Sequence, residues 1–455
     1  MKRVVNRKTS QGIASGKQLA LSLERGDETL TGELKEDAPV TRDSMMERVL
    51  ARANLIAALK RVTRNKGSGG VDGMSVEALP QYLKEHWPRI RRELLEGRYQ
   101  PQPVKRVSIP KPGGGERHLG IPTVVDRLIQ QALLQVIQPE WDRSFSGYSY
   151  GFRPNRSAHQ AIAQAQGFIR EGYRWVVDMD LEKFFDRVNH DKLMHRVKRR
   201  IEDRRVLRLI NGYLNAGVMT GYQVEPSTEG TPQGGPLSPL LANLLLDDLD
   251  KELERRGHRF VRYADDCNIY VKSKRSGERV LASVTRFLLR RLKLKVNQNK
   301  SAVDRPWRRT FLGFTFSYRG GIRIKVSEKA AASCKSAVRR LTKRTRGQSL
   351  RHVIADLRKY LLGWKAYYGI CQVKRTFVEL DKWIRRRLRS YAWKQWGRSG
   401  YRQLRRLGID VRLAWNTAKS AHGPWRLSRS PALNHGMPTS YFSGMGLPSL
   451  ADGKR

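Results

Sequence analysis

Apolar residues recur at helical spacing in the first third of the chain. The pattern covers residues 44–58, stops at the glycine-rich stretch 67–70, and a further segment runs over 71–95. Thr123 and Asp126 then have the spacing of a helix cap. The residues that follow them place one apolar face on a helix: Leu128, Ile129, Ala132, Leu133, Val136 and Ile137. This part of the chain is therefore predicted to be helical, with strands between the helices.

Short runs of β-branched and aromatic residues mark the strands. Residues 104–109 and 117–121 are separated by a Pro-Gly-Gly-Gly turn, which predicts a hairpin. Residues 175–180 predict a buried strand, and the runs 260–263 and 267–271 predict a hairpin around an Asp-Asp turn. Helices are expected near 191–201 and 237–249. Strand, helix, helix and hairpin in this order predict an α+β domain built on an antiparallel sheet.

The pattern changes after Gly320 and Gly321. From Ser327 onward the chain has 29 Lys and Arg against 6 Asp and Glu, and its apolar residues keep helical spacing. Between residues 380 and 391 an apolar stripe lies beside a run of arginines. A helix of this kind packs through one side and presents a basic surface on the other.

The charge of the whole chain indicates an anionic partner. Lys and Arg total 89 against 42 Asp and Glu, a net charge of +47. Nucleic acid is the partner that this charge favours. The alternative, a secreted or membrane-surface cationic protein, is disfavoured because the sequence has no leader pattern and no membrane-length apolar run. Cytoplasmic, nucleoid-associated localisation is expected. The cysteines Cys267, Cys334 and Cys371 lie too far apart for a zinc ribbon.

Two pairs of acidic residues are candidates for metal-dependent chemistry. Asp178 and Asp180 lie on one face of the predicted strand, and Asp265 and Asp266 occupy the hairpin turn. Phosphoryl transfer to a growing chain uses two divalent ions roughly 3.5–4 Å apart, held by carboxylates from separate elements. Mg²⁺ is the expected ion because it prefers hard oxygen ligands. Ordinary strand-end and turn carboxylates are the alternative.

Five blocks of sequence resemble the reverse transcriptases. They are Ile109–Gly114 with Arg117–Pro122, Asp180–Asp186, Thr231–Pro239, Tyr263–Asp266 (Tyr-Ala-Asp-Asp) and Phe311–Phe316. The segments Tyr360–Gly369 and Leu380–Leu388 resemble the thumb, or X domain, of group II intron maturases. The tail, with Ala432-Leu-Asn, Tyr441-Phe and Gly446–Leu450, resembles the bacterial members and, among them, subclass C.

The resemblance implies a role for individual residues. The implied metal ligands are Asp180, Asp265, Asp266 and the Leu181 carbonyl, with Asp178 as the alternative ligand. The implied nucleotide-binding residues are Lys111, Arg117, Phe185 and Gln233, with Phe185 excluding a 2′-hydroxyl unless its neighbour Phe184 does so. The implied primer-binding residues are Leu312, Gly313 and Phe314. A supporting role for Lys300 is weighed against an ordinary solvated lysine.

The resemblance also implies an architecture and a function. We expect a right-hand polymerase with fingers and palm over 44–325, a helical thumb over 326–425, a polar extension over 1–43, and a tail over 426–455 without an endonuclease domain. The chain would bind its group II intron RNA, assist splicing, and copy the intron into target DNA from a primer–template duplex and dNTPs, using two Mg²⁺ ions. Priming would come from an available DNA end, and no membrane partner is expected.

Three rivals remain at this point. One is another bacterial reverse transcriptase, such as a retron or diversity-generating enzyme, which the maturase-like thumb disfavours. The second is a non-enzymatic RNA-binding splicing factor, which the three intact acids disfavour. The third is an RNA-dependent RNA polymerase, which needs no aromatic gate at Phe185.

Overall fold

The chain has two compact units, and each is described here by itself. The computed structural model describes residues 44–110, 115–221, 223–227, 229–231 and 234–452. Within these residues the first unit contains 44–161 and 176–303, and the second contains 162–175 and 304–452. The predictions for residues 1–43, Lys111 and Gln233 lie outside the described residues.

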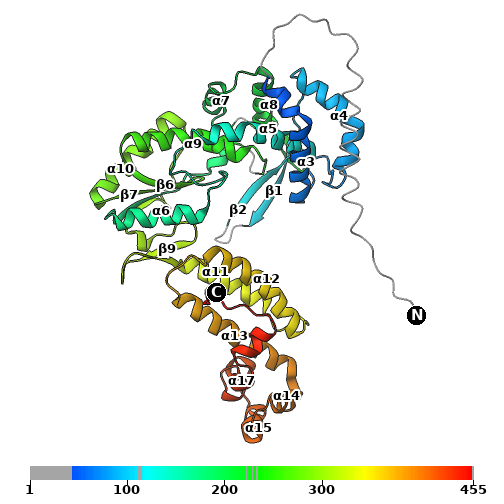
Figure 1. Cartoon of the computed structure of the whole chain (residues 1–455), viewed down its shortest axis with the longest axis vertical. Coiled ribbons are helices and arrows are strands. Elements are labelled where there is room, and N and C mark those ends of the chain that lie inside the picture. Colours follow the sequence, from blue (N-terminus) through cyan, green and yellow to red (C-terminus); the bar gives the residue numbers. More distant parts are fainter. Residues whose placement is uncertain (1–43, 111–114, 222, 228, 232–233, 453–455) are drawn as a thin grey trace, which may run out of the picture. The chain divides into compact units, whose positions relative to one another are not determined.

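The first unit joins two small sheets to a set of helices (Figure 1). Its helices are α2 (Met45–Leu50), α3 (Arg52–Asn65), α4 (Leu79–Leu95), α5 (Val124–Asp142), α7 (His190–Lys198), α8 (Arg204–Asn215), α9 (Ser238–Arg255) and α10 (Lys274–Phe287), with the short η2 (Phe184–Asp186) and η3 (Leu288–Leu292). Its strands are β1 (Val104–Pro110), β2 (Glu116–Ile121), β3 (Trp175–Met179), β4 (Val218–Thr220), β5 (Gln223–Glu225), β6 (Arg259–Tyr263), β7 (Asp266–Val271) and β8 (Ala302–Asp304).

The two sheets have different roles in the unit. One has the order β2-β1-β4-β5, and its antiparallel β1–β2 pair is the predicted hairpin, with Ile109 opposite Arg117. The other has the order β6-β7-β3-β8 and carries the Asp-Asp turn between β6 and β7. Helix α10 packs closely on this second sheet. A Cβ added at Gly277 would lie 2.5 Å from Val303 and 3.3 Å from Val271, so only glycine fits there.

Local chemistry explains where several helices begin. The Thr123 side chain caps α5 by accepting a hydrogen bond from the Asp126 amide, which confirms the predicted cap. The predicted helix over 44–58 is instead two helices. Ala51 has an extended ψ of 134° and separates α2 from α3. Met46, Val49 and Leu50 are buried on α2, so packing rather than a breaker residue decides this break.

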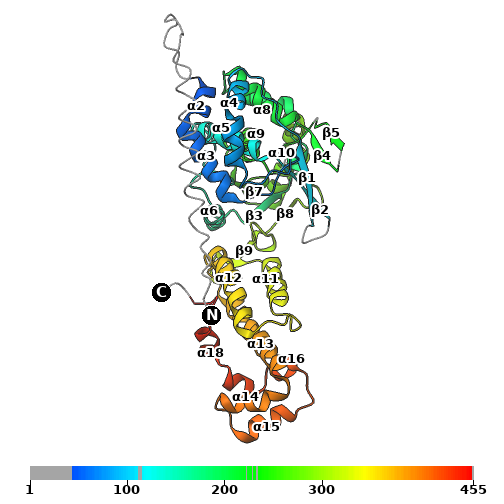
Figure 2. The ribbon, with the colours of Figure 1, turned by 90° about the vertical axis from the view of Figure 1, so that its right-hand side faces the viewer.

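The second unit is mainly helical (Figure 2). Its elements are α6 (Ala158–Arg170), η4 (Pro306–Arg308), β9 (Phe314–Ser317), β10 (Arg323–Val326), α11 (Glu328–Leu341), α12 (Leu350–Tyr368), α13 (Arg375–Trp396), η5 (Gly397–Ser399), α14 (Gly400–Arg406), α15 (Val411–Lys419), α16 (Pro424–Leu427), α17 (Pro431–Gly436) and α18 (Thr439–Gly444). The helices α11, α12 and α13 pack against one another. The apolar stripe predicted on α13 faces the core, with Leu380, Ile384 and Leu388 buried.

The end of the described chain is attached to α13. The buried Asp381 carboxylate accepts hydrogen bonds from the Leu450 and Ala451 amides, at 3.0 and 3.1 Å, and from Ser449 Oγ at 2.9 Å. Leu450 is itself buried. The region expected as a tail therefore contains packed helices. The compact units separate between Val303 and Asp304. This boundary does not test the predicted division between palm and thumb at residue 325, which stays a prediction. Among the residues described above, none of the helices has the length and apolar character that a bilayer crossing requires.

Candidate active site

Asp180 directly follows strand β3, which lies between β7 and β8 in the second sheet. The Asp180 amide donates to Ser301 Oγ at 3.0 Å, and its carbonyl accepts from the Asn297 amide at 2.8 Å. The Glu182 amide donates to the Lys295 carbonyl at 2.9 Å, and Leu181 pairs with Val296. The backbone of residues 180–182 is therefore held by the segment 295–301.

The hairpin turn between β6 and β7 delivers the other two acids. Tyr263 pairs with Asp266 across the hairpin, so Ala264 and Asp265 form a two-residue turn. Ala264 has a φ of 58°, in the left-handed region that such turns use. Cys267, the next strand residue, is buried, and burial raises the pKa of its thiol. Cys267 is therefore a packing residue of the sheet.

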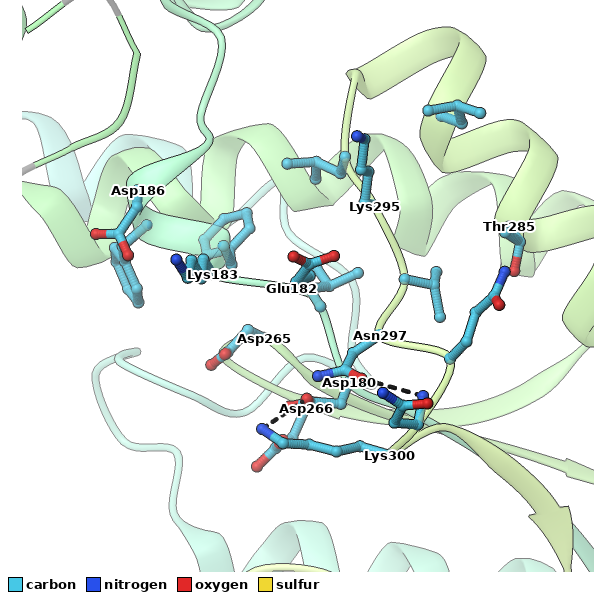
Figure 3. Close-up of a pocket in the computed structure, with 18 of the residues that line it drawn as sticks. Asp180, Glu182, Lys183, Asp186, Asp265, Asp266, Thr285, Lys295, Asn297 and Lys300 are labelled. Carbon is cyan, nitrogen blue, oxygen red and sulfur yellow. Dashed lines mark hydrogen bonds and ion pairs between the residues drawn. The ribbon is translucent and has the colours of Figure 1, made fainter. Parts of the chain in front are cut away.

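The three predicted acids line one pocket of the first unit. This pocket has a volume of about 1090 Å³, and Asp180, Asp265 and Asp266 line it together with Arg117, Phe185 and Lys300 among others. Figure 3 shows Asp180 and Asp266 beside the Lys300 ammonium group, whereas the Asp265 carboxylate points away from that group. Asp180 lines the pocket and Asp178 does not. The geometry therefore favours Asp180 over Asp178 as the functional acid of β3.

Burial and mutual repulsion make the acids hard to ionise together. Burial and, after it, the neighbouring charges of Asp265 and Asp180 together raise the pKa of Asp266 to about 7, while Lys300 opposes them. Burial also raises the pKa of Asp265, which Arg117 and Lys300 partly oppose. Additional positive charge in the pocket would relieve this repulsion.

The oxygen donors fit a hard divalent ion. Lys300 Nζ lies 3.1 Å from Asp180 Oδ2 as an ion pair, yet this buried oxygen accepts no hydrogen bond from the described residues. Carboxylate oxygens are the ligands that Mg²⁺ prefers. Over the described ranges of the chain, however, no three acidic, histidine or cysteine side chains converge closely enough to hold one ion. The three acids share a pocket, but their side chains do not form a complete coordination site for one ion.

The structure distinguishes the two neighbouring phenylalanines. Phe184 is 3% exposed and belongs to the core, whereas Phe185 is half-buried and lines the pocket. Arg117 is exposed on β2 and also lines the pocket. Phe185 and Arg117 both line the pocket, which is compatible with the predicted nucleotide binding. Their role in nucleotide binding stays a prediction.

In the second unit, the predicted primer-binding residues form a strained turn. Phe311 and Phe314 exchange two backbone hydrogen bonds of 2.9 Å, and the residues between them, Leu312 and Gly313, both have positive φ, 52° and 82°. The Tyr367 hydroxyl donates to the Leu312 carbonyl at 2.9 Å. Phe314 is completely buried, so only Leu312 and Gly313 are partly accessible.

The aromatic residues of α12 surround this turn. Phe314 lies 5.3 Å from the Tyr367 ring and 5.1 Å from the Tyr368 ring, and Trp364 lies 4.6 Å from Tyr368. Trp364 is buried, whereas Tyr367 and Tyr368 are half-buried. Sequence reasoning missed that they support the turn. It also missed Asn297 and Ser301, whose contacts with Asp180 connect residues more than a hundred positions apart and leave no local pattern.

Two family models match most of the region just described. The reverse transcriptase (RNA-dependent DNA polymerase) family matches residues 109–316, and the group II intron maturase-specific domain matches residues 331–408. Protein YkfC of Escherichia coli is 33% identical over 306 residues, which cover 58% of this chain and 80% of that protein. The intron-encoded protein LtrA of Lactococcus lactis is 30% identical over 342 residues, which cover 60% of this chain and 56% of LtrA.

The fold and the pocket define a nucleic-acid polymerase of the α+β class. The chain belongs to the group II intron-encoded reverse transcriptases, which join an RNA-directed DNA polymerase domain to a maturase domain. The relation extends to the putative COX1/OXI3 intron 1 protein of Saccharomyces cerevisiae, at 29% identity over 56% of this chain and 30% of that protein. Among solved structures, a partial Cas6-RT-Cas1–Cas2 complex matches with a TM-score of 0.35 and 24% identity over 57% of this chain and 46% of that one. The chain spans little more than half the length of LtrA.

Proposed function

We propose that the chain extends a primer 3′ end on an RNA template in the pocket of the first unit, using two Mg²⁺ ions. Asp180, Asp265, Asp266 and the Leu181 carbonyl are the proposed ligands. The observation that carries this proposal is that acids from two separate elements line one pocket and repel one another there. Reverse transcriptases use divalent metals as a family, and the number and identity of the ions belong to the proposal.

The bound ions would lower the pKa of the attacking 3′-hydroxyl and neutralise the charge of the departing pyrophosphate. The residues of the chain orient the reactants. Arg117, with Lys111, holds the triphosphate, Phe185 packs under the sugar, and Gln233 binds the nucleotide. Leu312 and Gly313 contact the primer strand, and the buried Phe314 supports their turn from the core. The 3′-oxygen then attacks the α-phosphorus, and the bond to pyrophosphate breaks.

The second unit and the extra charge suit a large RNA partner. We infer that the chain binds its own intron RNA, assists its splicing through shape and backbone contacts, and copies the intron into target DNA during retrohoming. The 29 basic residues from Ser327 onward support this inference. We expect this ribonucleoprotein to work in the bacterial cytoplasm, on the nucleoid. The proposed division is fingers and palm over 44–325, thumb over 326–425 and a C-terminal segment over 426–455.

The test separates catalysis from RNA binding. Asp265→Asn and Asp266→Asn preserve shape and remove one charge each, so we expect primer extension on RNA with dNTPs and Mg²⁺ to fall by at least about a hundredfold. Binding to the intron RNA should remain near wild type. The matched control is Asp186→Asn, an exposed acid of the same pocket that is not a proposed ligand. It should retain extension.

Other outcomes would contradict the proposal. Equal loss of extension and RNA binding in the Asp265 and Asp266 variants would mean that these residues are structural. A wild-type protein that binds intron RNA tightly and makes no DNA would be a splicing factor without polymerase activity.

A further inference from the structure

A completely buried arginine belongs to the hairpin that carries Asp265 and Asp266. Arg262, on β6, is 0% exposed, and its guanidinium forms a two-point ion pair with Asp250 of α9, at 2.7 and 2.5 Å. Asp250 is also 0% exposed. Neither residue lines the pocket of the three acids, and the proposed reaction does not use either of them.

Each N–H of this guanidinium has an acceptor. Besides the two bonds to Asp250, Nη1 donates to Asn243 Oδ1 at 3.0 Å and to the Ala264 carbonyl at 2.9 Å, and Nη2 donates to Ser149 Oγ at 2.8 Å. An arginine has five N–H donors in a rigid plane, and all five are satisfied here. The bond to Ala264 connects this network to the turn that carries Asp265 and Asp266.

The same turn is also held from the side. The Arg262 amide donates to the Tyr148 carbonyl and the Tyr150 amide to the Arg262 carbonyl, both at 2.9 Å, so the loop before Gly151 runs along β6. A Cβ added at Gly151 would lie 2.2 Å from the Ala264 nitrogen, so the two backbones are in direct contact. Asn243 Nδ2 donates to the Gly151 carbonyl at 2.8 Å, which joins this contact to the Arg262 network.

Stability alone is a weak reason for this arrangement. Replacing a buried ion pair with apolar residues of similar size is often neutral or stabilising, because removing two charges from water is costly. Steric strain disfavours an alanine in the left-handed region, where Ala264 lies with a φ of 58°, so the turn needs contacts that hold it. The network supplies such a contact at the alanine itself, next to the two acids that the turn presents.

We propose that Arg262 is a positioning residue for nucleotidyl transfer, which holds the Ala264 carbonyl, and with it the turn of Asp265 and Asp266, in the conformation that binds metal. Asp250, Asn243 and Ser149 fix the guanidinium, and Gly151 allows the loop to close on the turn. This inference rests on the proposed function, because it assumes that Asp265 and Asp266 are metal ligands.

Arg262→Lys tests the contact while keeping the buried charge. One ammonium nitrogen can pair with Asp250 but cannot also reach the other acceptors in the plane of a guanidinium. We expect kcat for primer extension to fall by about a hundredfold with little change in KM for dNTP, since small displacements of reacting groups have effects of that order. The control is Arg153→Lys. Arg153 is similarly buried and bonds Asp142 and the Ser146 and Ser149 carbonyls, but not the turn.

A second readout is independent of activity. The protein is bound to an RNA template with a dideoxy-terminated primer and the next dNTP, so that no reaction occurs. Mn²⁺ binding is then measured by the loss of the free-ion EPR signal. We expect weaker Mn²⁺ binding for Arg262→Lys and unchanged binding for Arg153→Lys. Unchanged kcat and Mn²⁺ binding in Arg262→Lys, or equal losses in both variants, would overturn the proposal.

Two glycine variants decide the case if Arg262→Lys does not fold. In Gly151→Ala the new Cβ meets the turn backbone, whereas at Gly147, in the same loop, a Cβ has open space. We expect reduced kcat and weaker Mn²⁺ binding for Gly151→Ala only, and equal behaviour of the two variants would refute the inference. Asp265→Asn distinguishes a failure of the proposed function from a failure of the inference about Arg262. If it stays active, the proposed function fails, whereas if it is inactive and Arg262→Lys is normal, only this inference fails.

Discussion

At the scale of single residues, two adjacent phenylalanines have different surroundings. Their rings lie 5.1 Å apart, edge to face, but Phe184 is in the core and Phe185 borders the pocket. Two adjacent residues on any helix or strand point in different directions. Here the short η2 element and Lys183 before it, which is in the left-handed region, determine that the Phe185 ring borders the pocket. Sequence spacing alone could not make this assignment.

Phe185→Ala is expected to weaken the discrimination between ribose and deoxyribose, because it removes the ring that would collide with a 2′-hydroxyl. The ratio of kcat/KM for a ribonucleotide to that for the matching deoxynucleotide should rise by about tenfold to a hundredfold. The control Phe184→Leu should lower stability and leave this ratio unchanged. An unchanged ratio in Phe185→Ala would assign the aromatic ring to packing.

Asp126 links the cap of α5 to the loop before β1. It is 1% exposed and accepts hydrogen bonds from Thr123 Oγ1 at 2.7 Å, the Tyr99 hydroxyl at 2.9 Å and the Gln102 amide at 3.2 Å. Burial outweighs these bonds and raises the pKa of Asp126 from 3.8 to about 6. Its charge therefore disfavours folding.

This shift predicts a stability that falls as pH rises. Below pH 3.8 Asp126 is neutral in both states, whereas between pH 3.8 and about 6 it ionises first in the unfolded chain, which favours unfolding. The loss amounts to about 3 kcal/mol once pH exceeds the folded pKa. In urea unfolding, the stability of wild type relative to Asp126→Asn should fall by most of that amount between pH 4 and 8. A constant difference would show that Asp126 titrates normally.

At the scale of elements, the sequence predicted what local chemistry decides. The Thr123 cap, the β1–β2 hairpin and the β6–β7 hairpin each depend on residues within a few positions of one another, and each is present. The turn of the last hairpin is one residue earlier than predicted, at Ala264 and Asp265, because Asp266 already pairs with Tyr263. The break at Ala51 and the pairing of 180–182 with 295–297 were missed, because they depend on distant packing partners. The short helices α17 and α18 were also missed, since burial of residues such as Leu433 and Phe442 stabilises them.

The turn between Phe311 and Phe314 combines backbone strain with a proposed role in primer binding. Leu312 has a φ of 52°, and two-residue turns with two positive φ angles favour Asn-Gly. Leu312→Asn should stabilise the chain by about 1 kcal/mol, a rise of a few degrees in the thermal midpoint. The opposite is expected for Gly313→Ala, because its Cβ would lie 2.6 Å from the Tyr368 hydroxyl.

Primer affinity provides the functional half of this test. If Leu312 contacts the primer, Leu312→Asn should raise KM for the primer–template while the protein becomes more stable. Stabilisation with unchanged KM would mean that the strained leucine has no role in primer binding. Destabilisation would contradict the argument from strain itself.

At the scale of the whole molecule, charge governs the interaction with nucleic acid. A net charge of +47 repels itself in the free protein, and binding to phosphates relieves that repulsion and releases counterions. This electrostatic contribution to binding does not depend on the RNA sequence, whereas recognition of one folded RNA depends on its shape. The two contributions should therefore respond differently to salt.

We expect the affinity for intron RNA to fall by about 10³ to 10⁵ between 50 and 200 mM salt, which corresponds to 6–10 phosphate contacts. An unrelated RNA of equal length should show a similar slope of log K against log salt but a weaker affinity at every salt concentration. Asp265→Asn should share the wild-type slope, because one acid in the pocket hardly changes the phosphate contacts. The measurement is filter binding across a salt series. A flat dependence would contradict electrostatic binding, and equal affinity for both RNAs would contradict recognition of a particular intron, leaving a polymerase that binds nucleic acid through charge alone.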